Sequence, residues 1–188
     1  MVGTARRHVV AALPGDREHE RHRRRILQLI DAHPDVLDRS CEPGHLTGSA
    51  MVVDAARRRF VLMLHAKLRT WLQPGGHADG DGELPKVALR EASEETGIDG
   101  LAVVTPAIDL DVHMVGPPHG PHLHLDVRYL VVAPPGAELR PNDEALDMRW
   151  VTIEEIGGYR PDLSTVRLAQ RALVGLDDLA ARGALPRL

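Results

Sequence analysis

Alternating apolar and polar residues predict β-strands through the middle of the chain. The clearest alternation runs from His122 to Val132. Because successive side chains of a strand point to opposite faces of a sheet, this segment presents two distinct faces. One face carries Leu123, Leu125, Val127 and Tyr129, and the other carries His122, His124, Asp126 and Arg128. Apolar segments bounded by turn residues predict further strands at residues 46–53, 60–64, 71–73, 101–104, 107–115 and 148–151.

Apolar residues spaced three and four apart, together with capping residues, predict helices. The predicted helical segments are residues 16–33, 83–96 and 164–174. Asp16 can cap the first helix, and Ser164 or Thr165 can cap the last. Gly97 and Gly175 are predicted to end the second and third helices.

The segment from Gly75 to Ile98 carries the strongest chemical signal. It is a glycine-rich loop followed by a helix that contains Glu91, Glu94 and Glu95. Residues three and four apart lie on one helix face, so these carboxylates converge and need cations to neutralise them. Oxygen ligands of this kind favour Mg²⁺ or Mn²⁺ rather than zinc.

The same segment resembles the Nudix box, G-x5-E-x7-R-E-U-x-E-E-x-G-U, in which U is a bulky apolar residue. Gly76 opens the pattern, and residues 90–98 close it with the sequence REASEETGI. One position departs, because the middle glutamate of the pattern falls on Gly82; Asp81 and Glu83 are the candidates to replace it. The resemblance implies an α/β/α sandwich with a mixed β-sheet between helices. We therefore expect an N-terminal helical arm over residues 1–44 and a Nudix domain with a C-terminal helix over residues 45–188.

Roles for the box residues follow from this resemblance. Glu91, Glu94 and Glu95 are expected to bind the cations, with the Gly76 carbonyl as a further ligand. Arg90 is expected to orient the carboxylates, and Glu94 or Glu95 is a candidate for the catalytic base. The implied activity is that of a Mg²⁺- or Mn²⁺-dependent pyrophosphohydrolase. Its substrate would be a nucleoside triphosphate, or a nucleoside diphosphate linked to another group.

Glu144 is a second candidate for metal binding or catalysis. It lies in the loop before the last predicted strand, where some Nudix hydrolases place an additional glutamate. The sequence is equally consistent with a turn that the neighbouring Asn142 and Asp143 side chains stabilise.

Histidines supply a third group of candidates. His122 and His124 share one strand face with Arg128, and this face can line the cleft and contact substrate, or it can simply be half-exposed. A His-x-His pair can also ligate a transition metal, but the spacing fixes no third ligand. His77 and Asp79 follow the double glycine and are candidates for substrate contact, with turn formation as the alternative.

Composition narrows the function classes. The chain has 188 residues and a formal net charge of -4, which argues against a general nucleic-acid or membrane binder. The single cysteine, the absence of a membrane-spanning apolar run and the lack of a signal-peptide core together favour the cytoplasm.

Two other activities remain open at this stage. A nucleotide-binding module that keeps the fold without turnover is suggested by Gly82. An enzyme resembling isopentenyl-diphosphate isomerase would need a catalytic cysteine, and Cys41 lies well before the box. The helix with the basic run at residues 21–25 could serve as a solvated face, a lid over the cleft or part of a homodimer contact.

Overall fold

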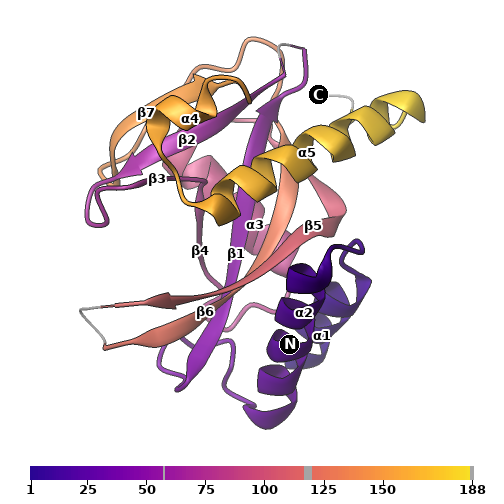
Figure 1. The fold of residues 1–188 in the computed structure, drawn as a ribbon, viewed down its shortest axis with the longest axis vertical. Coiled ribbons are helices and arrows are strands. Elements are labelled where there is room, and N and C mark those ends of the chain that lie inside the picture. Colours follow the sequence, from indigo (N-terminus) through magenta and orange to yellow (C-terminus); the bar gives the residue numbers. More distant parts are fainter. Residues whose placement is uncertain (57, 117–119, 187–188) are drawn as a thin grey trace.

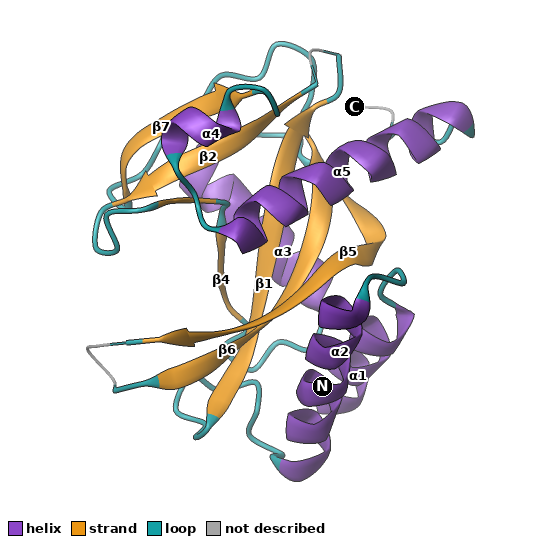
Figure 2. Cartoon of the chain, in the orientation of Figure 1, coloured by secondary structure: helices purple, strands orange, loops and turns teal. Residues whose placement is uncertain are grey.

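A mixed β-sheet lies between helices in the computed structural model, which describes residues 1–56, 58–116 and 120–186 (Figure 1). The strands are β1 (Gly44–Asp54), β2 (Arg59–His65), β3 (Trp71–Leu72), β4 (Gly75–His77), β5 (Ala102–Val115), β6 (His122–Val132) and β7 (Ala145–Val151). The helices are α1 (Val2–Ala11), α2 (Arg17–Ala32), α3 (Leu84–Thr96), α4 (Ile156–Tyr159) and α5 (Leu163–Ala181). Figure 2 shows α3 and α5 on opposite sides of the sheet. The predicted α/β/α sandwich is confirmed.

Strand β1 is the centre of the sheet and decides which residues meet. The order is β3-β2-β1-β6-β5, with β4 paired to β1 and β7 paired to β2. β1 and β6 run parallel, and their register places His45 beside His124 and Ser49 beside Arg128. The other strand pairs are antiparallel. Residues about 80 positions apart in sequence therefore become direct neighbours.

Successive side chains of a strand point to opposite faces of the sheet, and each face packs into its own apolar core. On β2, Val61 and Met63 pack into the core that includes α3, whereas Phe60 and Leu62 pack into the core beneath α5. Burying both sheet faces explains why the central strands are apolar at consecutive positions.

Most of the predicted elements are present, with differences at their ends. β5 is one strand with an irregularity between Val104 and Asp109, where two strands were predicted. The predicted helix end at Gly175 is wrong, because α5 continues to Ala181, for about two more turns, and buries Leu176 against the sheet. Its N-cap is Asp162, whose carboxylate accepts a hydrogen bond from the Thr165 amide at 2.7 Å. Of the predicted loop at residues 116–121, positions 117–119 lie outside the described residues.

The N-terminal arm contains a helix that the sequence did not predict, α1, in addition to α2. Asp16 caps α2 as predicted, accepting from the His19 amide at 2.9 Å. Arg23, in the basic run, donates to the carbonyl oxygens of residues 9, 10, 12 and 13 and so binds the end of α1. At least this part of the basic run therefore holds the arm together. Among the described residues, no helix is both long enough and apolar enough to span a bilayer.

Candidate functional site

Two glycines of β4 allow the box helix to approach the sheet closely. The Gly75 amide donates a hydrogen bond to the Glu95 carboxylate at 3.0 Å. A Cβ atom at Gly76 would overlap the carboxylate of Glu91. Glycine at this position therefore lets a carboxylate of α3 lie directly against the β4 backbone.

The carboxylates of α3 converge next to these glycines. Glu95 is only 4% exposed, Glu91 is half-buried and Glu94 is exposed. Burial is the main cause that raises the pKa of Glu95 to about 8; the Gly75 hydrogen bond opposes this, and the charges of Glu91, Glu144 and Glu94 add to it. A buried acid surrounded by other carboxylates is the electrostatic situation that a divalent cation relieves.

Arg90 holds one of these carboxylates in place. Its guanidinium donates to Glu91 at 2.6 Å and to the carbonyl oxygen of His77 at 3.1 Å. These bonds link α3 to the end of β4 and hold the Glu91 carboxylate against it.

A cleft of about 360 Å³ opens beside the box helix. It is lined by residues of the box, of the sheet and of the loops on either side, including Gly76, Glu91, His124, Asp126, Lys67 and Glu144. Within the described part of the chain, its lining includes no residue of α1 or α2. The prediction that the N-terminal helix forms a lid therefore finds no support in this structure.

Glu144, in the loop before β7, also lines the cleft. Its amide donates to the Asn142 side chain at 2.9 Å, which is the turn that the sequence allowed. Its carbonyl accepts from the Ala66 amide at 2.8 Å, which fixes the loop against the end of β2. The two interpretations are compatible, because the backbone makes the turn while the side chain lines the cleft.

The polar face of β6 continues across three strands. Strand register produces three rows, each with one residue from β1, β6 and β5: His45–His124–His113, Thr47–Asp126–Asp111 and Ser49–Arg128–Asp109. Arg128, predicted to contact substrate, is 1% exposed and donates to Asp126 at 2.6 Å and to Asp111 at 3.1 Å. The structure therefore encloses Arg128 among carboxylates instead of presenting it to the cleft.

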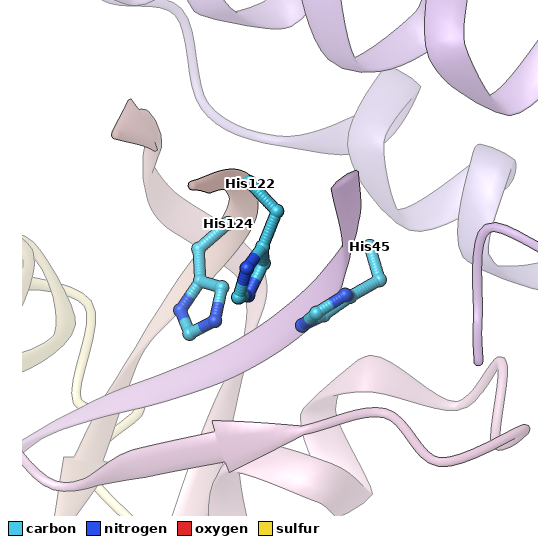
Figure 3. Close-up of side chains that lie close together, drawn as sticks. All are labelled: His45, His122 and His124. Atoms are coloured by element: carbon cyan, nitrogen blue, oxygen red, sulfur yellow. The ribbon is translucent and has the colours of Figure 1, made fainter. Parts of the chain in front are cut away.

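Five histidines gather at the end of this polar face: His45, His77, His113, His122 and His124. Figure 3 shows three of them, with His45 reaching from β1 toward His122 and His124 of β6. Burial is the largest cause that lowers the pKa of His45 to about 4, and of His124 to about 2. His45 was missed from the sequence, because only the parallel register of β1 and β6 brings it to the other two.

A family model for the NUDIX domain matches residues 44–171, which is more than half of the chain. This chain belongs to the Nudix hydrolase superfamily. The match begins at the first residue of β1 and includes the box, every cleft-lining residue except Arg39, and the first half of α5.

Individual Nudix proteins are similar to this chain at 12–32% sequence identity. A protein of Mycobacterium tuberculosis assigned as mutator protein MutT4 is 32% identical over 121 residues, which cover 63% of this chain and 48% of that protein. The chain thus spans about half the length of this curated relative. The C. elegans Ap4A hydrolase superposes with a TM-score of 0.57 at 16% identity, covering 71% of this chain and 98% of that one. The E. coli dihydroneopterin triphosphate pyrophosphohydrolase superposes with a TM-score of 0.58 at 12% identity, covering 69% and 95%. These two structures share the Nudix fold with this chain.

The departure from the Nudix box at Gly82 has a steric basis. A Cβ atom at Gly82 would overlap the carbonyl oxygen of Met1, at the start of α1. The two residues considered as replacements are engaged locally: Asp81 accepts from the Glu83 amide at 2.8 Å, and Glu83 lies 3.3 Å from the His8 ring. The box loop thus has a glycine at position 82, where the start of the N-terminal helix packs against it and leaves no room for a side chain.

Gly82→Glu is therefore expected to destabilise the docking of α1 instead of restoring a lost function. We expect a lower melting temperature, by roughly 3–6 °C for about 1–2 kcal/mol of overpacking, and faster proteolysis within residues 1–13. Gly157→Glu is the matched control, because a Cβ there meets no atom within 4 Å. Equal melting temperatures for the two variants, or higher hydrolase activity in Gly82→Glu, would contradict the steric explanation.

Asp79, a candidate for substrate contact, and Cys41, the cysteine considered for isomerase-like catalysis, each contact a charged neighbour. Asp79 forms a two-bond ion pair with Arg39, with the Nε–Oδ1 bond at 2.6 Å. Cys41 is buried and lies 3.5 Å from the Asp35 carboxylate; burial, together with Asp35, raises the pKa of its thiol to about 11. Cys41 does not line the cleft beside the box, so the structure gives no support to a catalytic cysteine there.

Glu95 also predicts how stability depends on pH when divalent cations are removed. Its pKa of about 8 in the fold exceeds the ordinary value of 4.5, so the fold prefers the protonated acid. This contribution to stability is complete below the unfolded pKa and is lost as pH rises through about 8. With chelator present, Glu95→Gln should be more stable than the wild type at about pH 9, with a free energy of unfolding higher by roughly 2 kcal/mol. At about pH 4 the two proteins should be almost equally stable. Calorimetry across pH measures this difference, and a variant that melts lower at high pH would refute it.

Proposed function

We propose that this protein is a Mg²⁺- or Mn²⁺-dependent pyrophosphohydrolase. Its substrate would be a nucleoside diphosphate linked to another group, or a nucleoside triphosphate, and it would cleave a phosphoanhydride bond. The observation that carries the proposal is that Glu91 and Glu144 line one cleft together with Gly76, while the charges of both act on the buried acid Glu95.

The residues of the box fit a hard divalent cation. Every donor is an oxygen, the glycine at position 76 leaves room for the Glu91 carboxylate, and Glu95 is a buried acid amid other negative charges. Glu91, Glu94 and Glu95 would hold the cations, with the Gly76 carbonyl as a further ligand. When bound, such cations neutralise the diphosphate and lower the pKa of a bound water.

The chain's own groups would then position the substrate and handle its protons. Arg90 keeps the Glu91 carboxylate turned toward β4 through its bonds to Glu91 and the His77 carbonyl. Glu94 and Glu95 on the helix, and Glu144 on the facing loop, are the carboxylates available to accept a proton from the attacking water. Arg39 and Lys67 line the same cleft and would contact phosphate oxygens.

Substrate contacts are proposed for two of the predicted histidines in particular. His77 and His124 line the cleft and can donate hydrogen bonds to phosphate or base. His122 is not among the residues that line the cleft, but it lies beside His124, with ring centroids 5.3 Å apart. The relatives are consistent with a phosphoanhydride substrate, since their names refer to Ap4A and to dihydroneopterin triphosphate.

Product analysis by mass spectrometry tests the proposal. The full chain would be incubated with Mg²⁺ or Mn²⁺ and with nucleoside triphosphates, nucleotide sugars, ADP-ribose, dinucleoside polyphosphates and isoprenoid diphosphates. Running the reaction in ¹⁸O-water shows which phosphorus atom is attacked. We expect metal-dependent cleavage of a phosphoanhydride in at least one nucleotide. Tight nucleotide binding without any cleavage would instead indicate a binding module, and isomerisation of isopentenyl diphosphate would indicate the isomerase-like alternative.

A further inference from the structure

We propose that His45, His122 and His124 form a binding site for a transition-metal ion of the zinc class, separate from the carboxylates of the Nudix box. Ligand nitrogens of these three side chains all lie within 4.8 Å of one another (Figure 3). Zinc–nitrogen bonds of about 2.0–2.1 Å in a tetrahedral site place the nitrogens about 3.3 Å apart. Small side-chain rotations would therefore bring the three nitrogens around one ion.

The burial of His45 is the second, independent observation. Its side chain is 1% exposed, and among the described residues neither ring nitrogen has a hydrogen-bond partner. Buried polar atoms without a partner are rare in folded proteins and call for a cause. The ring centroid of His45 lies 4.9 Å from that of His122 and 5.0 Å from that of His124. An ion between the three rings would accept the lone pair that otherwise has no partner.

His122 is already oriented as a ligand. Its Nδ1 lies 2.9 Å from the carbonyl oxygen of Gly120. Because a carbonyl oxygen only accepts hydrogen bonds, Nδ1 carries the proton and Nε2 keeps its lone pair. Metal-binding histidines generally show this arrangement, in which the second nitrogen donates to a carbonyl or carboxylate and fixes the ring.

The sheet supplies a rigid framework for the site. His45 and His124 are direct neighbours in the parallel register of β1 and β6, and His122 lies two residues before His124 on the same strand face. Three neutral imidazoles suit Zn²⁺, Co²⁺, Ni²⁺ or Cu²⁺, whereas Mg²⁺ prefers the oxygens of the box. Three protein ligands also leave a fourth position for water, as in open zinc sites.

The test is a Co²⁺ titration of the chelator-treated full chain, followed by visible absorption, with Zn²⁺ as competitor. We expect one equivalent of Co²⁺ to bind in a nitrogen-ligated site and Zn²⁺ to displace it. His45→Leu and His122→Asn should each weaken Zn²⁺ binding at least roughly 100-fold. His45→Leu replaces a buried polar ring by an apolar side chain, so we expect it to fold. His122 is only half-buried, so His122→Asn decides the question if His45→Leu does not fold.

Two control variants keep the result specific. Cys41→Ser alters a second group of side chains whose ligand atoms lie in mutual reach among the described residues, namely His33, Asp35 and Cys41. Glu91→Gln alters the Nudix box, and we expect it to lose hydrolysis while retaining Zn²⁺ binding. The metal-binding result can therefore be interpreted even if the proposed hydrolase function is wrong. Unchanged Zn²⁺ affinity in both histidine variants, loss of affinity in Cys41→Ser, or no stoichiometric binding by the wild type would each overturn the proposal.

Discussion

Glu95→Gln is expected to lower kcat for phosphoanhydride hydrolysis by roughly 1,000-fold or more, which corresponds to about 4 kcal/mol of lost transition-state stabilisation. The proposed cation depends on negative charge at this buried position, which glutamine lacks. The substitution keeps the shape of the side chain, and the glutamine carbonyl can still accept the 3.0 Å bond from the Gly75 amide. The fold should therefore survive while the chemistry is lost.

Comparison with two other glutamates makes this result interpretable. Glu91→Gln should cause a similar loss, because Glu91 lines the cleft and is held there by Arg90. Glu138→Gln makes the same chemical change at an exposed residue outside the cleft lining and should leave kcat within about twofold. Steady-state kinetics in saturating Mg²⁺ and then saturating Mn²⁺ would separate weakened cation binding from lost turnover. Comparable activity in Glu95→Gln and Glu138→Gln would rule out a catalytic part for the box carboxylates.

The box carboxylates could be predicted from the sequence because their geometry is local. A helix places residues three and four apart on one face, and Gly76 and Arg90 lie close by in the chain. The same reasoning recovers the central strands, whose short runs of consecutive apolar residues reflect apolar cores on both faces of one sheet. In both cases the information lies within a single element or in two elements that follow one another.

Residues brought together by long-range pairing could not be found in the same way. His45 stands alone in the sequence, and only the parallel pairing of β1 with β6 places it beside His124. Arg128 alternates with histidines and so was predicted to face the cleft, but its partners Asp109 and Asp111 come from β5. Helix α1 was missed because its small buried residues, Ala5 and Val9, acquire a core only when the arm packs on the domain.

The second large effect concerns the buried ion-pair network around Arg128. Arg128→Met is expected to destabilise the fold by about 3–5 kcal/mol, lowering the melting temperature by roughly 10 °C. The guanidinium contacts Asp109, Asp111 and Asp126, all of which are almost fully buried. Methionine fills similar space but leaves these carboxylates without that cation. Denaturant unfolding at neutral pH measures the loss.

Exposed arginines provide the control for this substitution. Arg182→Met removes an ion pair with Asp178 on the surface of α5, where both side chains are more than half exposed. Pairs of this kind contribute about 0–1 kcal/mol, so the change in stability should be small. A loss in Arg182→Met as large as that in Arg128→Met would mean that the buried network has no special importance.

The pH dependence of the effect distinguishes lost charge from lost packing. Burial alone would raise the pKa of Asp111, but the hydrogen bonds from His113 and Arg167 and the charge of Arg128 outweigh it and hold the pKa below its usual range. A depressed pKa contributes stability that is present above the unfolded value of about 3.9 and is lost as pH falls below it. Without Arg128 this contribution shrinks, so the gap between wild type and Arg128→Met should narrow as the pH is lowered toward about 3. A gap of constant size from neutral to acidic pH would show that packing around the arginine stem, and not its charge, stabilises this part of the sheet.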